Sequence, residues 1–99
     1  MASGVPVVLV VDENIDLYEY ISTSLSGRYS VLWAPSGNDA LNMIREGMPT
    51  LLVSEIQLPD MDGISFAQQV RKKIKTSRIP MIFLTSKIEK ESQLKATEA

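Results

Sequence analysis

The sequence predicts an α/β domain in which a parallel sheet is covered by helices on both faces. The first supporting observation is an alternation of strand-like and helix-like segments, repeated four times across 99 residues without a linker or low-complexity tract. The second is that the strand-like segments are continuous apolar runs, which are typical of strands buried on both faces of a parallel sheet. Such a repeat predicts right-handed crossovers and a single domain over residues 1–99.

The first unit pairs a strand over residues 7–11 with a helix that ends before Gly27. The run Val-Val-Leu-Val-Val is apolar and β-branched, and it stops at Asp12 and Glu13. The apolar residues of the following helix fall on one face: Leu17, Tyr18, Ile21 and Leu25.

The second unit is a strand over residues 30–34 followed by a helix that begins near Ser36. Ser36 is the expected N-cap, and Asp39 three residues later makes the start similar to a capping box. Gly47 and Pro49 are expected to end this helix. Its predicted apolar stripe consists of Ala40, Leu41, Ile44 and Met48.

The third and fourth units are a strand over 50–54, a helix from 64 to about 75, a strand over 79–85 and a weak helix over 87–96. The third helix is expected to bury Phe66, Ala67, Val70 and Ile74. Its basic residues, interpreted as a solvated face rather than a binding site, are Arg71, Lys72, Lys73 and Lys75.

Composition excludes several kinds of function. The net charge of −2 and the pI of about 5.0 give no surface that would neutralise nucleic-acid phosphates, so no direct contact with nucleic acid is expected. The chain contains no cysteine and no histidine, which excludes disulfides, Cys/His zinc sites and nucleophile–histidine pairs. The apolar run at 7–11 is too short for a signal core or a membrane span, and a cytoplasmic domain is expected.

Acidic and hydroxyl side chains follow three of the predicted strands. Asp12 and Glu13 follow the first, Glu55 follows the third, and Thr85 lies at the end of the fourth. In open α/β sheets, ligands bind beyond the carboxyl ends of the strands, so these side chains are expected to converge. Carboxylates that lie close together repel one another, and a hard divalent cation such as Mg²⁺ relieves that repulsion.

Each of these features has a plainer explanation when it is taken alone. Acidic residues such as Asp12 and Glu13 are favoured near the N-terminus of a helix, because they interact with its dipole. Thr85 can equally be an ordinary residue at the end of a strand. The segment Pro-Asp-Met-Asp-Gly at 59–63 is also a turn, in which Asp62 caps the following helix. The joint placement of the three acidic positions favours a site.

Three segments resemble the receiver domains of response regulators and hybrid sensor kinases. They are Val-Leu-Val-Val-Asp-Glu-Asn at 8–14, Leu-Pro-Asp-Met-Asp-Gly at 58–63 and Arg-Ile-Pro-Met-Ile-Phe-Leu-Thr-Ser at 78–86. The residues of these segments are most similar to those of receivers inside hybrid kinases that carry a DNA-binding output domain. The resemblance implies a flavodoxin-like, doubly wound sheet with strand order 2-1-3-4-5, of which 2-1-3-4 is expected here. It also implies a histidine kinase or phosphotransfer domain as partner, and an output domain.

Carried over by position, the resemblance implies a role for five residues. Asp12 and Glu13 are implied as acids of a Mg²⁺ site, to which the backbone carbonyl of Gln57 contributes. Glu55 occupies the position of the phosphoacceptor, where the family has an aspartate. By the same resemblance, the side chain of Glu55 is also implied to be part of the metal site. Thr85 is implied to contact the phosphoryl group and to move on activation.

The chain departs from the family pattern in two ways. Glu55 is one methylene longer than aspartate, which moves the carboxylate by roughly 1.5 Å. The family continues into a fifth strand that bears a lysine and then a fifth helix, so the domain is expected to be incomplete at its C-terminus. Without the fifth strand, the fourth becomes an apolar edge, for which self-association is expected.

Three hypotheses about function follow. The leading hypothesis is a signalling receiver that is part of a phosphorelay. Because of Glu55, this receiver is expected to be degenerate or to imitate the phosphorylated state. It is not expected to be an enzyme by itself, but to belong to a hybrid histidine kinase. The second is an active phosphoacceptor that takes a phosphoryl group from a kinase histidine onto Glu55. The third is a small anion- or nucleotide-binding domain, which the absence of a glycine-rich phosphate loop after the first strand disfavours.

Overall fold

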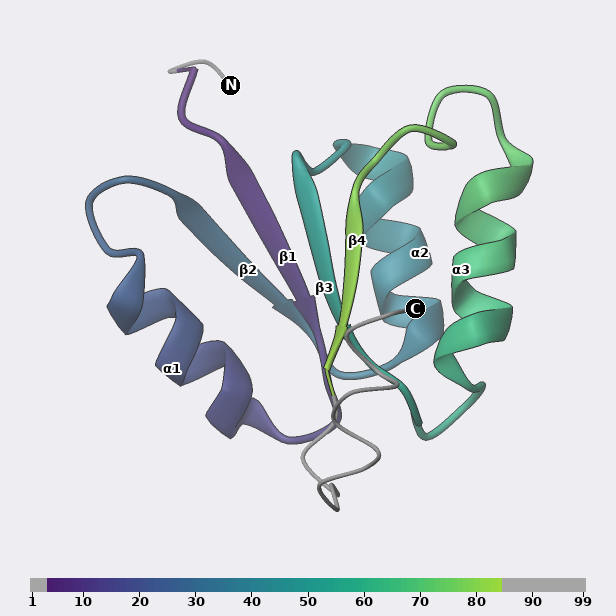
Figure 1. Ribbon diagram of the computed structural model, residues 1–99, viewed down its shortest axis with the longest axis horizontal. Coiled ribbons are helices and arrows are strands. Elements are labelled where there is room, and N and C mark those ends of the chain that lie inside the picture. The colour runs from purple at the N-terminus through teal and green to yellow at the C-terminus, as the bar shows by residue number, and fades with distance from the viewer. Residues whose placement is uncertain (1–3, 85–99) are drawn as a thin grey trace.

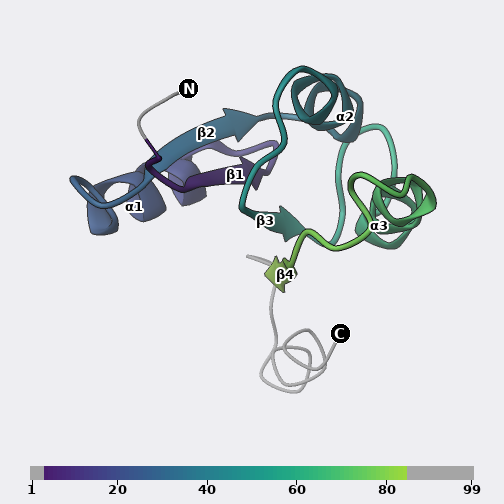
Figure 2. The same ribbon diagram turned by 90° about the horizontal axis from the view of Figure 1, so that it is seen from above.

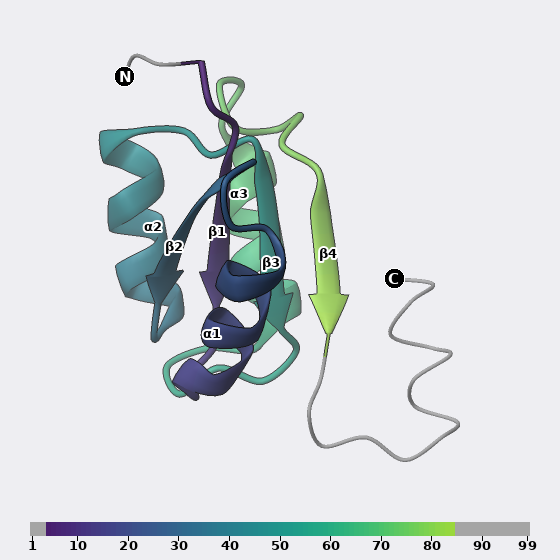
Figure 3. The ribbon, with the colours of Figure 1, turned by 90° about the vertical axis from the view of Figure 1, so that its left-hand side faces the viewer.

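The computed structural model describes residues 4–84 and contains a four-stranded parallel sheet between two helical layers (Figure 1). The strands are β1 (Val7–Val11), β2 (Ser30–Ala34), β3 (Leu51–Glu55) and β4 (Met81–Leu84). The helices are α1 (Ile15–Ser24), α2 (Gly37–Glu46) and α3 (Gly63–Lys72). The sheet order β2-β1-β3-β4 confirms the predicted fold class and strand order, and all four arrows point the same way in Figure 3. The helix predicted over 87–96 lies outside the described residues.

The helices divide between the two faces of the sheet (Figure 2). On one face, Val8, Val10 and Val53 pack against the apolar side of α1. On the other face, residues of the alternate strand positions pack against α2 and α3, and Leu9 and Leu52 are central to that cluster. Within residues 4–84, no helix is long and apolar enough to cross a membrane.

The central strands position the site because their register is fixed by burial on both faces. β1 and β2 have the predicted bounds, whereas β3 begins and ends one residue later than predicted. Val11 of β1 lies opposite Ser54 of β3, so the residues that follow this pair emerge together at the carboxyl edge. Glu55 is therefore the last residue of β3, paired with Leu84 of β4.

The predicted helix caps are confirmed. The Asp39 N–H donates to Ser36 Oγ at 3.1 Å, and the Ser36 hydroxyl donates to Asp39 Oδ2 at 2.9 Å, which makes a reciprocal cap at the start of α2. Asp62 caps α3 by accepting a hydrogen bond of 2.7 Å from the Ser65 N–H. Asn14, one residue before α1, accepts from the Asp16 N–H in the same manner.

The predicted end of α2 at Gly47 is confirmed, whereas the predicted burial of Met48 and the predicted extension of α3 to about residue 75 are wrong. Met48 lies beyond the end of α2 and is 53% exposed, and Ile74 lies beyond the end of α3 and is 92% exposed. The backbone leaves the helical region at Lys73, and the buried Thr76 folds back to donate its hydroxyl to the Val70 carbonyl. At this end of α3 the buried residue is therefore Thr76, whereas Ile74 points to solvent.

Candidate functional site

The carboxyl ends of β1 and β3 bring two buried carboxylates together. Asp12 directly follows β1 and is 4% exposed, and Glu55 ends β3 and is 7% exposed. Charged side chains are rarely this buried without a partner or a function. Glu13, next along the chain, is exposed at the rim of the same edge. Two of the predicted site acids are therefore buried at the switch point of the sheet, and the third is at its surface.

The pKa of Asp12 is raised above its ordinary value of 3.8. Burial makes the largest contribution, and the negative charges of Glu55, Glu13 and Asp16 add to it. The Asn14 N–H donates to Asp12 Oδ1 at 2.9 Å and opposes the rise. At Asp12, burial and the neighbouring acids therefore outweigh the hydrogen bond from Asn14.

Removing the charge of Asp12 is expected to stabilise the fold. Asp12→Asn keeps an oxygen for the Asn14 N–H and removes the buried charge, which should raise the free energy of unfolding by about 1 kcal/mol at neutral pH. Because the folded-state pKa of Asp12 is raised, its ionised form opposes folding above that pKa. The gain should shrink as pH falls through the raised pKa toward 3.8. Urea unfolding at several pH values measures this.

The matched control for that substitution is Asp16→Asn, an exposed acid in the first turn of α1. It removes the same charge without relieving burial, so its effect on stability should be much smaller. Equal stabilisation by both variants, or destabilisation by Asp12→Asn, would contradict the claim that burial disfavours the ionised form of Asp12.

Two contacts from β2 fix the backbone of Asp12. The Asp12 N–H donates to the Ala34 carbonyl at 3.0 Å, and the Trp33 indole N–H donates to the Asp12 carbonyl at 2.8 Å. The ring of Trp33 also lies beside that of Tyr18 on α1, with centroids 6.3 Å apart. Sequence reasoning did not identify Trp33 as part of this site, because no local pattern signals a contact over 21 residues.

The carboxylate of Glu55 turns back toward its own backbone. Glu55 Oε2 accepts a hydrogen bond of 3.0 Å from the Ile56 N–H. The neighbouring Ser54 hydroxyl donates to the Glu55 carbonyl at 2.9 Å, and Ser54 is itself fully buried. The end of β3 is thus held by local hydrogen bonds on both its side chain and its main chain.

The loop after β3 is a compact turn that closes onto the start of α3. Gly63 N–H donates to the Ile56 carbonyl at 2.5 Å, and Leu58 N–H donates to the Met61 carbonyl at 3.1 Å. A β-carbon at Gly63 would lie 2.9 Å from both the Glu55 carbonyl oxygen and the Phe83 ring. This glycine therefore allows α3 to start directly against the end of β3.

Asp60, at the tip of the loop, joins it to the start of α2. Its two carboxylate oxygens accept hydrogen bonds from the Gly37 N–H at 2.9 Å and the Asn38 N–H at 2.8 Å. Burial raises the pKa of Asp60, but these two donors and the backbone N–H of Asp60 itself together outweigh it, so the net shift is downward. Met61 packs onto Gly37, where a β-carbon would come within 2.7 Å of its side chain. The turn pattern at 59–63 predicted a turn but gave no sign of this contact with α2.

The remaining predicted site residues lie in different surroundings. The Gln57 side chain is exposed, and its backbone pairs with that of Asp62 in an isolated bridge. Thr85, the expected phosphoryl contact, lies outside the described residues.

The potential metal-ligand atoms at this edge are of the kind that a hard divalent cation prefers. They are oxygens only, and the repulsion that raises the pKa of Asp12 is what a cation would relieve. Within residues 4–84, no three acidic side chains are grouped closely enough to form a ligand set by themselves. A bound ion would therefore also need backbone oxygens and water.

Known proteins resemble this chain in both sequence and structure. Over 80 residues the chain is 32% identical to Histidine kinase P4 of Formosa agariphila. This match covers 81% of the chain and 6% of the kinase. Over 90 residues it is 31% identical to Hybrid signal transduction histidine kinase D of Dictyostelium discoideum, covering 91% of the chain and 6% of that protein. The chain thus spans less than a tenth of the length of these relatives.

The structural match supports the same family. The chemotaxis response regulator CheY4 of Vibrio cholerae superposes with a TM-score of 0.79 at 28% identity, covering 95% of this chain and 81% of that one. The sequence profile of the response regulator receiver domain matches residues 8–99. Receiver domains act in two-component signal transduction, partner with histidine kinases or phosphotransfer domains, and typically bind Mg²⁺. The chain belongs to the response regulator receiver domain family.

Proposed function

We propose that this chain is a degenerate receiver, a signalling module whose state is not set by phosphorylation at the usual position. The observation that carries the proposal is Glu55, which stands at the end of β3 beside Asp12 and accepts a hydrogen bond from the Ile56 N–H. A nucleophile must approach phosphorus in line, and the longer side chain alters that placement. A misplacement near 1 Å costs on the order of a hundredfold in such a reaction.

The same side chain supports a fixed signalling state. In an extended conformation, released from the Ile56 N–H, the glutamate side chain would carry its negative charge farther from the backbone than an aspartate does, closer to where a phosphoryl group would lie. It therefore imitates part of the charge that phosphorylation adds. The mimicry is partial, because a phosphoryl group brings about −1.5 to −2 charges and three acceptor oxygens.

Mg²⁺ is proposed to bind weakly at this edge. Asp12, Glu13 and Glu55 would supply carboxylate oxygens, and Gln57 would supply its backbone carbonyl. A bound ion would offset the charge of the acids and of an incoming phosphoryl group. Asp12 is held in place for this role by the contacts from Trp33 and Ala34. Thr85 is proposed to contact a phosphoryl group.

A titration with beryllofluoride, which imitates a phosphoryl group, tests the proposal. In the presence of Mg²⁺, ¹⁹F NMR should show no saturable binding to the unmodified chain. A receiver with aspartate at the corresponding position serves as the positive control. Saturable binding that Asp12→Asn abolishes would mean that the pocket still accepts a phosphoryl-like group, and the degenerate function would be wrong.

The partners are proposed from the family. A histidine kinase or phosphotransfer domain would contact the edge around Asp12 and Glu55, and an output domain on the same or another chain would read the state of the receiver. The chain contains no histidine, so a phosphohistidine donor must lie elsewhere. The proposal includes a cytoplasmic location, which the absence of cysteine fits.

Self-association through β4 is proposed as well. Among residues 4–84, β4 lies at the edge of the sheet, and Ile82 is 46% exposed there. An apolar edge strand invites pairing with another chain. Sedimentation or light scattering should show a concentration-dependent dimer, which Ile82→Lys weakens. A chain that stays monomeric at high concentration would contradict this.

A further inference from the structure

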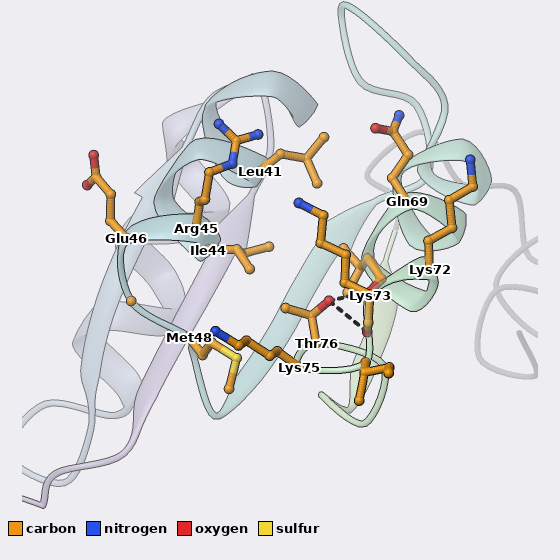
Figure 4. A pocket seen from close by; sticks show the side chains of 13 residues that line it. Leu41, Ile44, Arg45, Glu46, Met48, Gln69, Lys72, Lys73, Lys75 and Thr76 are labelled. Carbon is orange, nitrogen blue, oxygen red and sulfur yellow. Dashed lines mark hydrogen bonds between the residues drawn. The ribbon is translucent and has the colours of Figure 1, made fainter.

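From the groove between α2 and α3, we infer a second docking surface, suited to an acidic amphipathic helix of a partner protein. The groove has a volume of about 900 Å³ and is lined by the C-terminal parts of both helices and the turn after α3 (Figure 4). Because α2 and α3 begin at the carboxyl edge of the sheet, the groove lies at the opposite end from Asp12 and Glu55. It is therefore independent of the proposed function, and neither depends on the other.

The floor of the groove is apolar and joined to the core. Ile44 of α2 and Val70 of α3 are 5% and 2% exposed, and the half-buried Leu41 lies beside them. Thr76 closes the end of α3 by donating its hydroxyl to the Val70 carbonyl. The floor is thus preformed by packed side chains, as small binding sites usually are.

Two large apolar side chains stand at the open rim. Ile74 is 92% exposed and Met48 is 53% exposed, and both line the groove. Neither is needed to fill the core, because Thr76 and the residues of the floor already do so. A partner that covered them would remove apolar surface from water, which is the main favourable term in association.

The rim carries an excess of positive charge, which lies on the side of α3 and of the turn after it. Its cations are Arg45, Lys72, Lys73 and Lys75, against a single carboxylate at Glu46. Figure 4 shows Lys73 and Lys75 extending from the α3 side toward α2. This concentration stands out on a chain whose net charge is −2, and it selects an acidic partner by complementarity.

Arg71, a further basic residue of α3, differs from these cations because it has a structural role. Arg71 donates to the Ile79 carbonyl at 2.7 Å, so it ties α3 to the segment before β4. No hydrogen bond of the side chains of Lys72, Lys73 or Lys75 exists within residues 4–84. The helix dipoles favour cations in the last turns of both helices, which accounts for Arg45 on α2 and Lys72 on α3 but not for Lys75. An amphipathic helix with acidic flanks satisfies both the apolar floor and the charged rim.

The test uses a fluorescein-labelled synthetic peptide that is helical, with leucine along one face and glutamate on both flanks. Anisotropy should show saturable binding to the unmodified chain that weakens as salt rises. The same peptide with lysine flanks should not bind, and a version with glutamine in place of leucine should bind about tenfold more weakly. Equal binding of the glutamate and lysine peptides would overturn the inference.

Matched variants of the chain identify the surface. Lys73→Glu should weaken binding about tenfold, whereas Arg28→Glu, the same charge reversal in the α1–β2 connection, should leave it nearly unchanged. Ile74→Ala should also weaken it about tenfold, whereas Ile64→Ala, at a 51% exposed site near the start of α3, should not. Ile74 and Lys73 are exposed, so these variants are expected to fold.

Two further outcomes would overturn the inference. The first is unchanged peptide binding by both Lys73→Glu and Ile74→Ala. The second is tighter binding of a labelled oligonucleotide than of the peptide, sensitive to Lys73→Glu but not to Ile74→Ala, because it would assign the rim to nucleic-acid phosphates.

Discussion

Glu55→Asp is expected to increase magnesium-dependent phosphorylation by about a hundredfold. The shorter side chain would withdraw the carboxylate by roughly one bond, to the depth at which the family places its nucleophile. Both forms should be compared in the same chain, with and without a fifth strand supplied from a complete receiver. Labelling by a small phosphodonor, followed by intact mass over time, measures the difference.

Two controls make that comparison specific. Glu55→Gln removes the charge but keeps the length, and it should give no labelling. Adding Asp12→Asn to Glu55→Asp should abolish the gain, because the metal site would lose an acid. Equal labelling of the glutamate and aspartate forms would show that the extra methylene does not disable the pocket.

Phe66→Ala is expected to lower the free energy of unfolding by about 3–5 kcal/mol. Phe66 is 0% exposed and belongs to the cluster that joins α3 to the sheet, to α2 and to Leu58 of the loop after β3. Domains of this size have a total stability of about 5–15 kcal/mol, so the loss would be a large share of it. Urea unfolding monitored by Trp33 fluorescence and by circular dichroism measures the change.

Phe66→Leu is the matched control, because it keeps an apolar side chain of intermediate size in the same place. It should cost clearly less than Phe66→Ala. An exposed position on the same helix, Gln68→Ala, should change stability little. A small cost for Phe66→Ala would mean that the cluster collapses to fill the cavity, and that α3 is held in place by other contacts.

Local patterns in the sequence predicted much of the fold. The continuous apolar run at 7–11 is a central strand, and the caps at Ser36 and Asp62 lie where their spacing placed them. These features depend on neighbours within a few residues, which a sequence displays directly. The strand order followed from the resemblance to the receiver family rather than from any such pattern.

Contacts between distant segments were not predictable in the same way. Asp60 was seen only as a turn residue, although its carboxylate caps α2 across more than 20 residues. The contact of Trp33 with Asp12 was likewise not expected. Ile74 was expected in the core because helical periodicity has no means of showing that α3 would end before it and that Thr76 would be the buried residue instead. Each of these depends on how separate elements pack, which no local pattern encodes.

The most direct test of the degenerate receiver is the intact mass of the unmodified chain after incubation with Mg²⁺ and a small phosphodonor. The prediction is a spectrum without a phosphate adduct, under conditions in which a receiver with the usual aspartate is labelled. A stoichiometric, acid-stable and base-labile adduct that maps to Glu55 would contradict it, and would make this chain an active phosphoacceptor.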